Sequence, residues 1–144
     1  MRYLMALAYD GSKFYGYQKQ PKVKTVQEEL ERALTMINNK QVNVSASGRT
    51  DAGVHALNQK AHFDLDIKIT PDKLKQALNS LIDKSIYIKS VEEVDDNFHA
   101  RFNVLKKEYV YKINVGEYNP LEKDYVFQYN KKLNLDDMKR AIKY

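Results

Sequence analysis

The stretch TVQEELERALTMINN, from Thr25 to Asn39, decides the fold, because it places an amphipathic helix between two sets of strand signals. Thr25 is a favourable N-cap, and Glu28 stands at the spacing that completes a capping box. Asn38 and Asn39 are expected to end the helix. The apolar residues recur at helical spacing and form one buried stripe, made of Val26, Leu30, Ala33, Leu34 and Ile37.

Strand signals lie on both sides of this helix. Residues 2–9 end at the turn signal Asp10-Gly11, and residues 42–45 form a short second strand candidate. Residues 59–66 alternate between polar and apolar side chains, which predicts a half-buried strand. Its buried face is expected to carry Ala61, Phe63 and Leu65.

A second helix is predicted from Thr70-Pro71, an N-cap followed by proline at the first helical position. Its buried stripe consists of Leu74, Ala77, Leu78 and Leu81. Strand signals resume at Ile86, so the element order is β-α-β-β-α-β. This is the ferredoxin-like order, an α+β fold in which both helices pack on one face of an antiparallel sheet. The other face of the sheet is free for a partner and suits RNA.

The rest of the chain carries weaker signals. The acidic residues from Glu92 to Asp96 indicate a solvated turn. Residues 106–115 are predicted to form a strand, because Tyr109, Tyr111, Ile113 and Val115 would share one face. Asn134 is predicted to cap a third helix, with Asp136 and Asp137 in its first turn. The apolar stripe of that helix has little left to pack against before Tyr144, so we expect further chain beyond it.

Composition bounds the class of protein. The chain has 144 residues, 43% of them hydrophobic, which is enough for one compact domain. Lys and Arg outnumber Asp and Glu by 24 to 19, a net charge of +5. This charge favours nucleic-acid binding, with an ordinary basic protein as the alternative. Cysteine is absent, which excludes thiolate nucleophiles and fits a reducing cytoplasm. No apolar run reaches the length of a membrane span.

The segment SGRTDAGVHA, residues 47–56, carries the chemistry. Gly48 and Gly53 bracket Arg49 and Asp51 inside a predicted loop, which can hold the carboxylate in a fixed, exposed position. Arg49 is expected to keep Asp51 ionised by charge pairing, and an ionised carboxylate can act as nucleophile or base. The alternative is an aspartate that caps a turn beside an ion pair, and the spacing alone leaves both interpretations open.

The remaining candidates are less specific. The loop after the first strand mixes aromatic side chains with Lys13, Gln18, Lys19, Lys22 and Lys24, and can contact RNA phosphates and riboses or simply be solvated. Arg101 is a candidate partner for a phosphate or carboxylate. His62, Asp64 and Asp66 have the spacing of one strand face, which a solvated surface explains without a metal. No metal or cofactor is therefore expected, and no phosphate-binding glycine motif occurs.

Three segments together resemble the tRNA pseudouridine synthase A (TruA) family: SGRTDAGVHA, YDGSKFYGYQKQP at residues 9–21, and NFHARFNVLKKEYVYKI at residues 97–113. The resemblance implies two ferredoxin-like halves with a basic cleft between them. It implies Asp51 as the catalytic nucleophile, Arg49 as the residue that helps displace the target base, and Tyr109 as the aromatic residue that contacts the flipped uracil. Plain packing is the alternative for Tyr109.

The resemblance further implies that the whole protein is an isomerase of uridine in the anticodon stem-loop of tRNA. It would work without a cofactor, as a cytoplasmic homodimer. Residues 1–115 would form the catalytic subdomain and residues 116–144 the start of a second subdomain, so we expect poor activity from the 144 residues alone. The rival hypothesis is a non-catalytic RNA-binding module of the RRM type, which has no reason to possess the GRTD loop.

Overall fold

A computed structural model describes residues 1–144, which divide into two compact units, Met1–Lys107 and Glu108–Tyr144. The first unit ends before residue 115, where we placed the end of the catalytic subdomain. The assignment of the two parts to a catalytic and a second subdomain stays a prediction. No helix in the chain is both long and apolar enough to cross a membrane.

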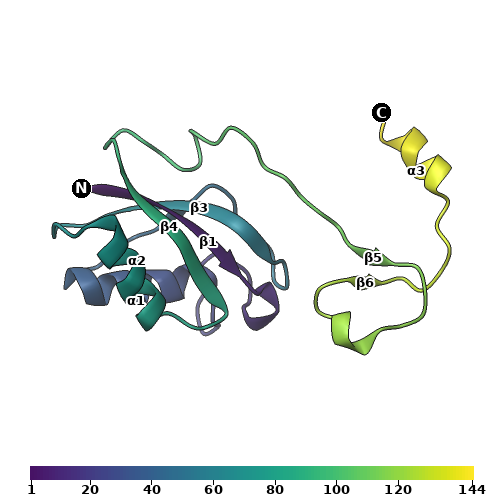
Figure 1. The fold of residues 1–144 in the computed structure, drawn as a ribbon, viewed down its shortest axis with the longest axis horizontal. Helices are drawn as coiled ribbons and strands as arrows, with labels where there is room; N and C mark the ends of the chain where they lie inside the picture. The colour runs from purple at the N-terminus through teal and green to yellow at the C-terminus, as the bar shows by residue number, and fades with distance from the viewer. The chain divides into compact units, whose positions relative to one another are not determined.

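The first unit has the predicted element order (Figure 1). It runs β1 (Arg2–Tyr9), α1 (Val26–Asn38), β2 (Ser45–Ala46), β3 (Ala56–Asp64), α2 (Pro71–Leu81) and β4 (Ile86–Val94). The sheet order is β2-β3-β1-β4, and every neighbouring pair is antiparallel. Both helices lie on one face of the sheet. The α+β, ferredoxin-like prediction is confirmed.

Local signals explain the helix boundaries. The Thr25 hydroxyl accepts a hydrogen bond from the Glu28 backbone N–H at 3.3 Å, as the capping box predicts. Asn39 ends α1 in the left-handed conformation, at φ 56°. Thr70 occupies the N-cap of α2, but its side chain makes no capping bond, so Pro71 at the start is the effective signal there.

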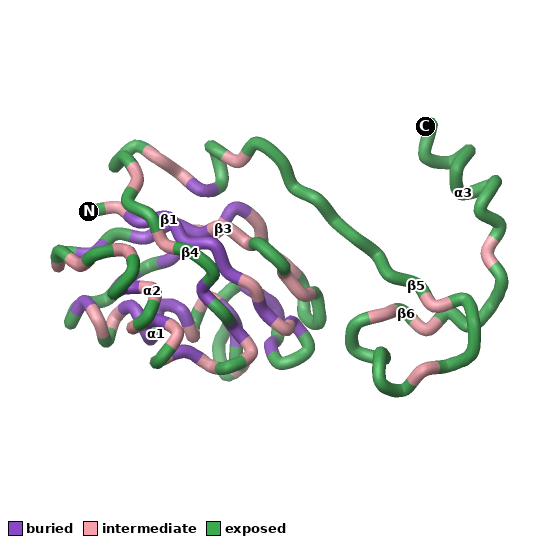
Figure 2. Tube along the Cα trace, in the orientation of Figure 1, coloured by how far each residue is buried: buried purple, intermediate pink, exposed green.

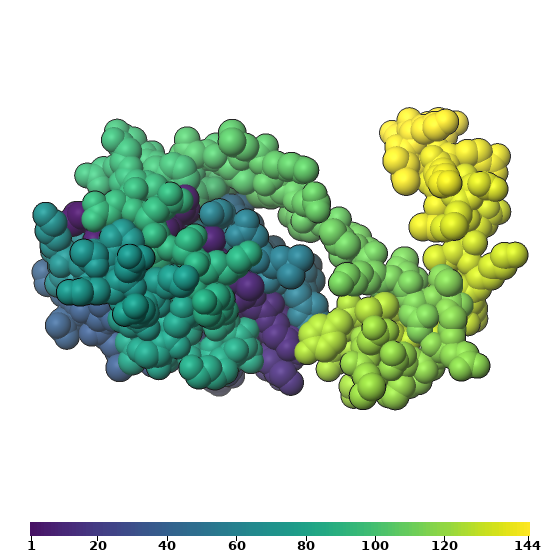
Figure 3. Space-filling model, in the orientation of Figure 1, coloured from purple at the N-terminus to yellow at the C-terminus, as the bar shows by residue number.

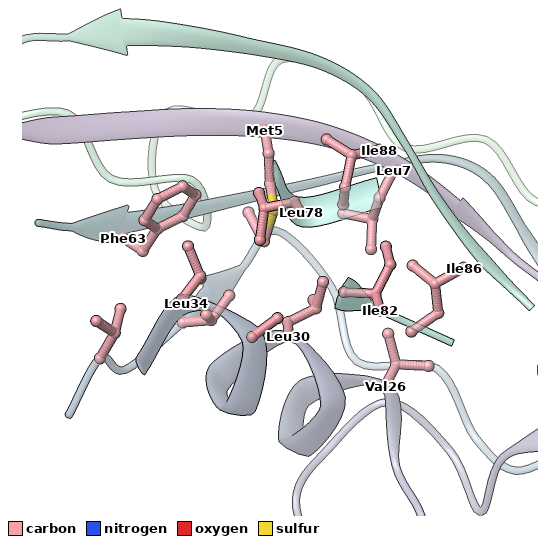
Figure 4. Packing of buried hydrophobic residues seen from close by; sticks show 14 of the residues in the cluster. Met5, Leu7, Val26, Leu30, Leu34, Phe63, Leu78, Ile82, Ile86 and Ile88 are labelled. Carbon is pink, nitrogen blue, oxygen red and sulfur yellow. The ribbon is translucent and has the colours of Figure 1, made fainter. Parts of the chain in front are cut away.

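The core lies between the sheet and the two helices (Figure 4). Alternate side chains of β1, including Tyr3, Met5 and Leu7, are fully buried. Met5 and Leu7 point toward the helix layer, where Leu30 and Leu34 of α1 are also fully buried. Burial of this apolar surface, about 25 cal/mol for each square ångström, is the main term that fixes the sheet on the helices.

The second strand is shorter and later than predicted. It spans Ser45–Ala46 rather than residues 42–45. The reason is that side chains of α1 form hydrogen bonds with the backbone N–H and C=O of Val44. The Glu31 carboxylate accepts the Val44 N–H at 3.1 Å, and the Gln27 side-chain amide donates to the Val44 carbonyl at 3.2 Å. Residues 42–44 therefore lie along the helix instead of pairing with β3.

The predicted strand at residues 106–115 is wrong. In the second unit only β5 (Ile113–Asn114) is a strand within that range, and it pairs in parallel with β6 (Phe127–Gln128). Residues 104–112 pair with no other strand. Most of the second unit is exposed (Figure 2), and Tyr111 has 87% of its surface exposed to solvent. Alternating side chains form a strand only where a partner strand completes the hydrogen bonds.

The third helix is confirmed. α3 spans Leu135–Ala141, and a short 3-10 helix, Pro120–Glu122, precedes it in the second unit. The Asn134 side-chain oxygen accepts the Asp137 N–H at 3.1 Å, so the predicted N-cap is formed.

The segment that follows β4 is anchored on the sheet (Figure 3), where it lies over the start of β1. Arg2 forms an ion pair with Asp64 and donates to the carbonyls of Asp96, at 2.6 Å, and Phe98, at 2.9 Å. His62 accepts the Ala100 N–H through Nδ1 at 3.1 Å. His62 is buried, so the expected solvated face of β3 is wrong at this position. The anchored segment covers it.

The first loop after β1 packs on the loop that contains the GRTD sequence. Gly11 begins a short 3-10 helix, Gly11–Lys13, and its N–H donates to His55 Nδ1 at 3.0 Å. A Cβ added at Gly11 would overlap the backbone carbonyl of Val54. Only glycine allows this close approach.

We predict a pH-dependent stability that arises from His62. Burial, the nearby His99 and the charge of Arg2 lower its pKa. The unfolded chain therefore binds a proton more readily than the folded chain below the usual histidine pKa of about 6.5. The free energy of unfolding should be highest above that pH and fall on acidification toward the lowered folded pKa. Urea unfolding from about pH 7.5 to about pH 5 measures this slope. The slope should shrink in His62→Gln, and an unchanged slope would contradict the assignment.

A second prediction concerns Gly11. Gly11→Ala should destabilise the fold by about 1–3 kcal/mol, because the backbone at Val54 must move. It should also speed amide hydrogen exchange at residues 50–55. Gly48→Ala is the matched control, since its Cβ would meet only side chains, the nearest being that of Gln59 at 3.8 Å. Equal stability and equal exchange in the two variants would disprove the contact.

Candidate active site

The loop that joins β2 to β3 is tied down where it leaves β2. The Ser47 N–H donates to the Lys60 carbonyl at 2.8 Å, which extends the pairing with β3. The Ser47 hydroxyl donates to the Gln59 side-chain oxygen at 2.7 Å, and the Gln59 amide donates to the Gly48 carbonyl at 2.8 Å. The backbone that leads to Arg49 is therefore fixed by the neighbouring strand.

The residue before Asp51 is held from two directions. The Thr50 hydroxyl is 2.7 Å from the Tyr9 hydroxyl, at the end of β1. The Thr50 carbonyl accepts the Tyr17 N–H at 3.0 Å. Tyr9 and Tyr17 are both buried, so these partners belong to the core. Thr50 thus connects the loop to rigid structure one residue before the candidate nucleophile.

A tight turn follows Asp51. Its carbonyl accepts the Val54 N–H at 3.1 Å, and Gly53 adopts φ 82°, a conformation that side chains disfavour. The Asp51 side chain is exposed. The predicted arrangement, an exposed carboxylate on a loop held at both ends, is therefore present. Such a group can approach a ligand without moving the fold.

Arg49 is exposed and does not pair with Asp51. Its Nη1 donates to the Gln18 side-chain oxygen at 3.3 Å. The expectation of an Arg49–Asp51 ion pair is wrong for this structure, because the amide oxygen of Gln18 is the acceptor that the guanidinium reaches. The positive charge stays two residues from the carboxylate in the sequence, and the guanidinium forms its side-chain hydrogen bond with a neutral amide.

Three predicted site residues come together beside β2. Gln18, Arg49 and Arg101 line one pocket of about 280 Å³, together with His99 and Phe102. His99 and Phe102 were not predicted as site residues from the sequence. No local pattern marks them, because they reach this place only through the anchoring of the segment after β4.

The predicted lysines are dispersed. Lys13 lies in the short 3-10 helix and is exposed, and Lys22 is exposed in the loop that follows. Lys19 forms an ion pair with Glu31 at 3.2 Å. Lys24 hydrogen-bonds Asp83 and holds the pKa of that carboxyl at about 2. Two of these lysines therefore connect elements of the fold.

Tyr109 belongs to the second unit, where the residue is 69% exposed. Within that unit Tyr109 is not packed in a core, so the alternative interpretation of plain packing has no support there. No group of three or more histidine, aspartate or glutamate side chains is arranged to hold a metal ion.

Comparison with known proteins places the chain in a family. Residues 5–103 match the family model described as tRNA pseudouridine synthase. The chain is 46% identical over 144 residues to tRNA pseudouridine synthase A of Listeria monocytogenes serovar 1/2a, which covers 99% of this chain and 58% of that protein. Its identity to the protein of the same name from Mycoplasma genitalium is 44% over 138 residues, 96% of this chain and 57% of the relative.

A third relative of that name, from Geobacillus sp. (strain WCH70), is 45% identical over 139 residues, 95% of this chain and 56% of the relative. The chain thus spans somewhat more than half the length of the curated relatives it matches. The family match covers most of the first unit, including both strands that flank the GRTD loop and the anchored segment after β4. The chain belongs to the tRNA pseudouridine synthase family.

Proposed function

We propose that the protein containing this chain isomerises uridine to pseudouridine in tRNA, with Asp51 as the nucleophile. The observation that carries the proposal is the exposed Asp51 carboxylate, one residue after a threonine that the buried Tyr9 and Tyr17 hold. A positioned carboxylate of this kind suits covalent or acid–base chemistry at a nucleoside. The relatives that share up to 46% identity carry the name tRNA pseudouridine synthase A.

The reaction needs no group donor. The bond between the ribose and the uracil nitrogen breaks, a bond from the ribose to a ring carbon forms, and the proton on that carbon moves to the freed nitrogen. Atoms and electrons balance within the nucleoside, so neither an oxidant nor a cofactor is required. The protein has to hold the detached base, exclude water and supply one carboxylate.

Arg49 and Tyr109 have supporting roles in this proposal. A uridine inside a stem is inaccessible, so it must leave its stack before Asp51 can reach it. The exposed Arg49 guanidinium, two residues from Asp51, supplies positive charge where the base departs. Tyr109 offers an exposed ring on which the extruded uracil can stack.

The charge of the chain supports a tRNA partner. The net charge is +5, and exposed Lys13, Lys22 and Arg101 can contact phosphates. Gln18 and Lys19 would join them if their partners Arg49 and Glu31 release them. We further propose the anticodon stem-loop as the target, a homodimer as the working form and the cytoplasm as the location, all from the family resemblance. The 144 residues alone are proposed to be poorly active.

The rival function is an RNA-binding module without catalysis. The four-stranded sheet is compatible with it, but an exposed carboxylate repels RNA phosphates and serves no binding purpose. The rival predicts tRNA binding without turnover.

The test is substitution of Asp51 in the full-length protein. Asp51→Asn should lower pseudouridine formation in unmodified tRNA by at least about a thousandfold, because it removes the nucleophile and little else. Its affinity for tRNA should stay close to that of the unchanged protein. Asp66→Asn is the control, since Asp66 is an exposed aspartate whose side chain pairs with Lys40 at the surface. Undiminished turnover in Asp51→Asn would refute the proposal, and no turnover in the unchanged protein would favour the rival.

A further inference from the structure

The pocket beside β2, here called the edge pocket, is lined by Gln18, Arg49, His99, Arg101, Phe102 and the strand residue Ala46, among others. It lies entirely within the first unit and next to the loop that carries Asp51. The proposed chemistry uses only Arg49 of these residues. Gln18 and Arg101 enter the proposed function only as general contacts for RNA, and the other lining residues have no role in it.

The backbone of β2 supplies free hydrogen-bonding groups to the edge pocket. β2 is an edge strand, paired only with β3. The Ser47 N–H points to β3, and the backbone groups of Val44 point to α1. Because backbone groups alternate along a strand, the N–H and C=O of Ala46 face away from β3, on the side of Val44. A planar group with its own donors and acceptors could pair there.

Phe102 supplies an unusual aromatic surface. The residue is 77% exposed, yet its ring stacks on that of His99, with the centroids 4.3 Å apart. The His99 ring in turn contacts the ring of the buried His62 edge to face, with the centroids 4.5 Å apart. Phe102 is therefore the outer layer of a short stack that begins in the sheet. The free face of its ring is a platform for a further flat group.

The charge of the edge pocket is one-sided. Arg49 and Arg101 bring two guanidinium groups, and no aspartate or glutamate lines the pocket. Arginine suits phosphate, because its planar donors match two phosphate oxygens at once.

One buried donor has no partner in the protein. The Tyr17 hydroxyl is shielded from solvent and makes no hydrogen bond, although Tyr17 lines the edge pocket. Burial, with smaller effects from Tyr9 and Glu31, raises the pKa of this hydroxyl, so it keeps its proton. Because the hydroxyl is itself shielded, an occupant of the edge pocket cannot reach it without a movement of side chains, so the hydroxyl takes no part in binding there.

We propose that the edge pocket holds one nucleotide of an unpaired RNA segment next to the target uridine. The base stacks on the Phe102 ring and hydrogen-bonds the backbone N–H and C=O of Ala46. The phosphate lies between Arg49 and Arg101. The neighbouring position follows from the chain, since the Cα atoms of Arg49 and Asp51 are at most about 7 Å apart, which one nucleotide spans. This inference rests on the proposed function, because that function puts the target uridine at Asp51.

The absence of tryptophan from the chain gives a direct test in the full-length protein, with any tryptophan outside these residues replaced. Phe102→Trp places a single reporter on the proposed platform, and its exposed site should tolerate the larger ring. Unmodified tRNA should quench its fluorescence in a saturable way, and uridine monophosphate at the same concentration should not. Tyr87→Trp is the matched control, since Tyr87 is 55% exposed on β4, the opposite edge strand. It should respond to neither. Equal quenching in the two variants, or none in Phe102→Trp, would overturn the proposal.

Affinity gives a second readout. Phe102→Leu should weaken tRNA binding about 5- to 100-fold, the range expected for loss of one stacked base, while Phe102→Tyr should bind as the unchanged protein does. Tyr87→Leu should have little effect. Failure of the two proposals can be told apart. Pseudouridine formation by a Phe102→Trp variant whose fluorescence does not respond would reject the edge pocket alone. Quenched fluorescence in that variant, without pseudouridine formation by the unchanged protein, would reject the catalytic proposal and the position next to a target uridine, and would leave only nucleotide binding at the edge pocket.

Discussion

The hydrogen bonds that hold Thr50 are the constraint on which the rest of the site depends. Its side chain meets the Tyr9 hydroxyl at 2.7 Å and its carbonyl accepts the Tyr17 N–H at 3.0 Å. Both tyrosines are buried between sheet and helices, so the position of the loop is set by the core. Asp51 follows directly and projects into solvent. Catalysis by a carboxylate depends on such preorganisation, because little has to be reordered when the substrate arrives.

The sheet brings together two segments that are far apart in the sequence. The loop with Arg49 leaves β2, and the segment with Arg101 and Phe102 follows β4, at the opposite edge of the sheet. Arg2 and His62 bind that second segment back across the sheet. A basic, aromatic surface is thereby assembled next to an exposed carboxylate, and this combination is suited to an unpaired, negatively charged strand.

The sequence predicted what is encoded locally. The capping box and stripe of α1, the bounds of β1 and the glycine-bracketed loop with an exposed Asp51 are all present. Prediction from the sequence failed where groups distant in the chain compete for the same hydrogen-bond partners or where no partner is present. Side chains of α1 displace the second strand, and residues 106–112 alternate without a partner strand. The Arg49 guanidinium, expected to pair with Asp51, hydrogen-bonds Gln18 instead. Phe102 could not be identified as a site residue, because its place depends on the buried His62.

The most direct test of the account is a structure of the full-length protein bound to unmodified tRNA. The measured quantity is the distance from the Asp51 carboxylate to the nearest atom of an extruded uridine. The account predicts a uridine out of its stack, with its ribose or base in contact with that carboxylate, at about 3 Å. A bound tRNA whose extruded uridine lies against a different carboxylate, with Asp51 facing solvent, would contradict it.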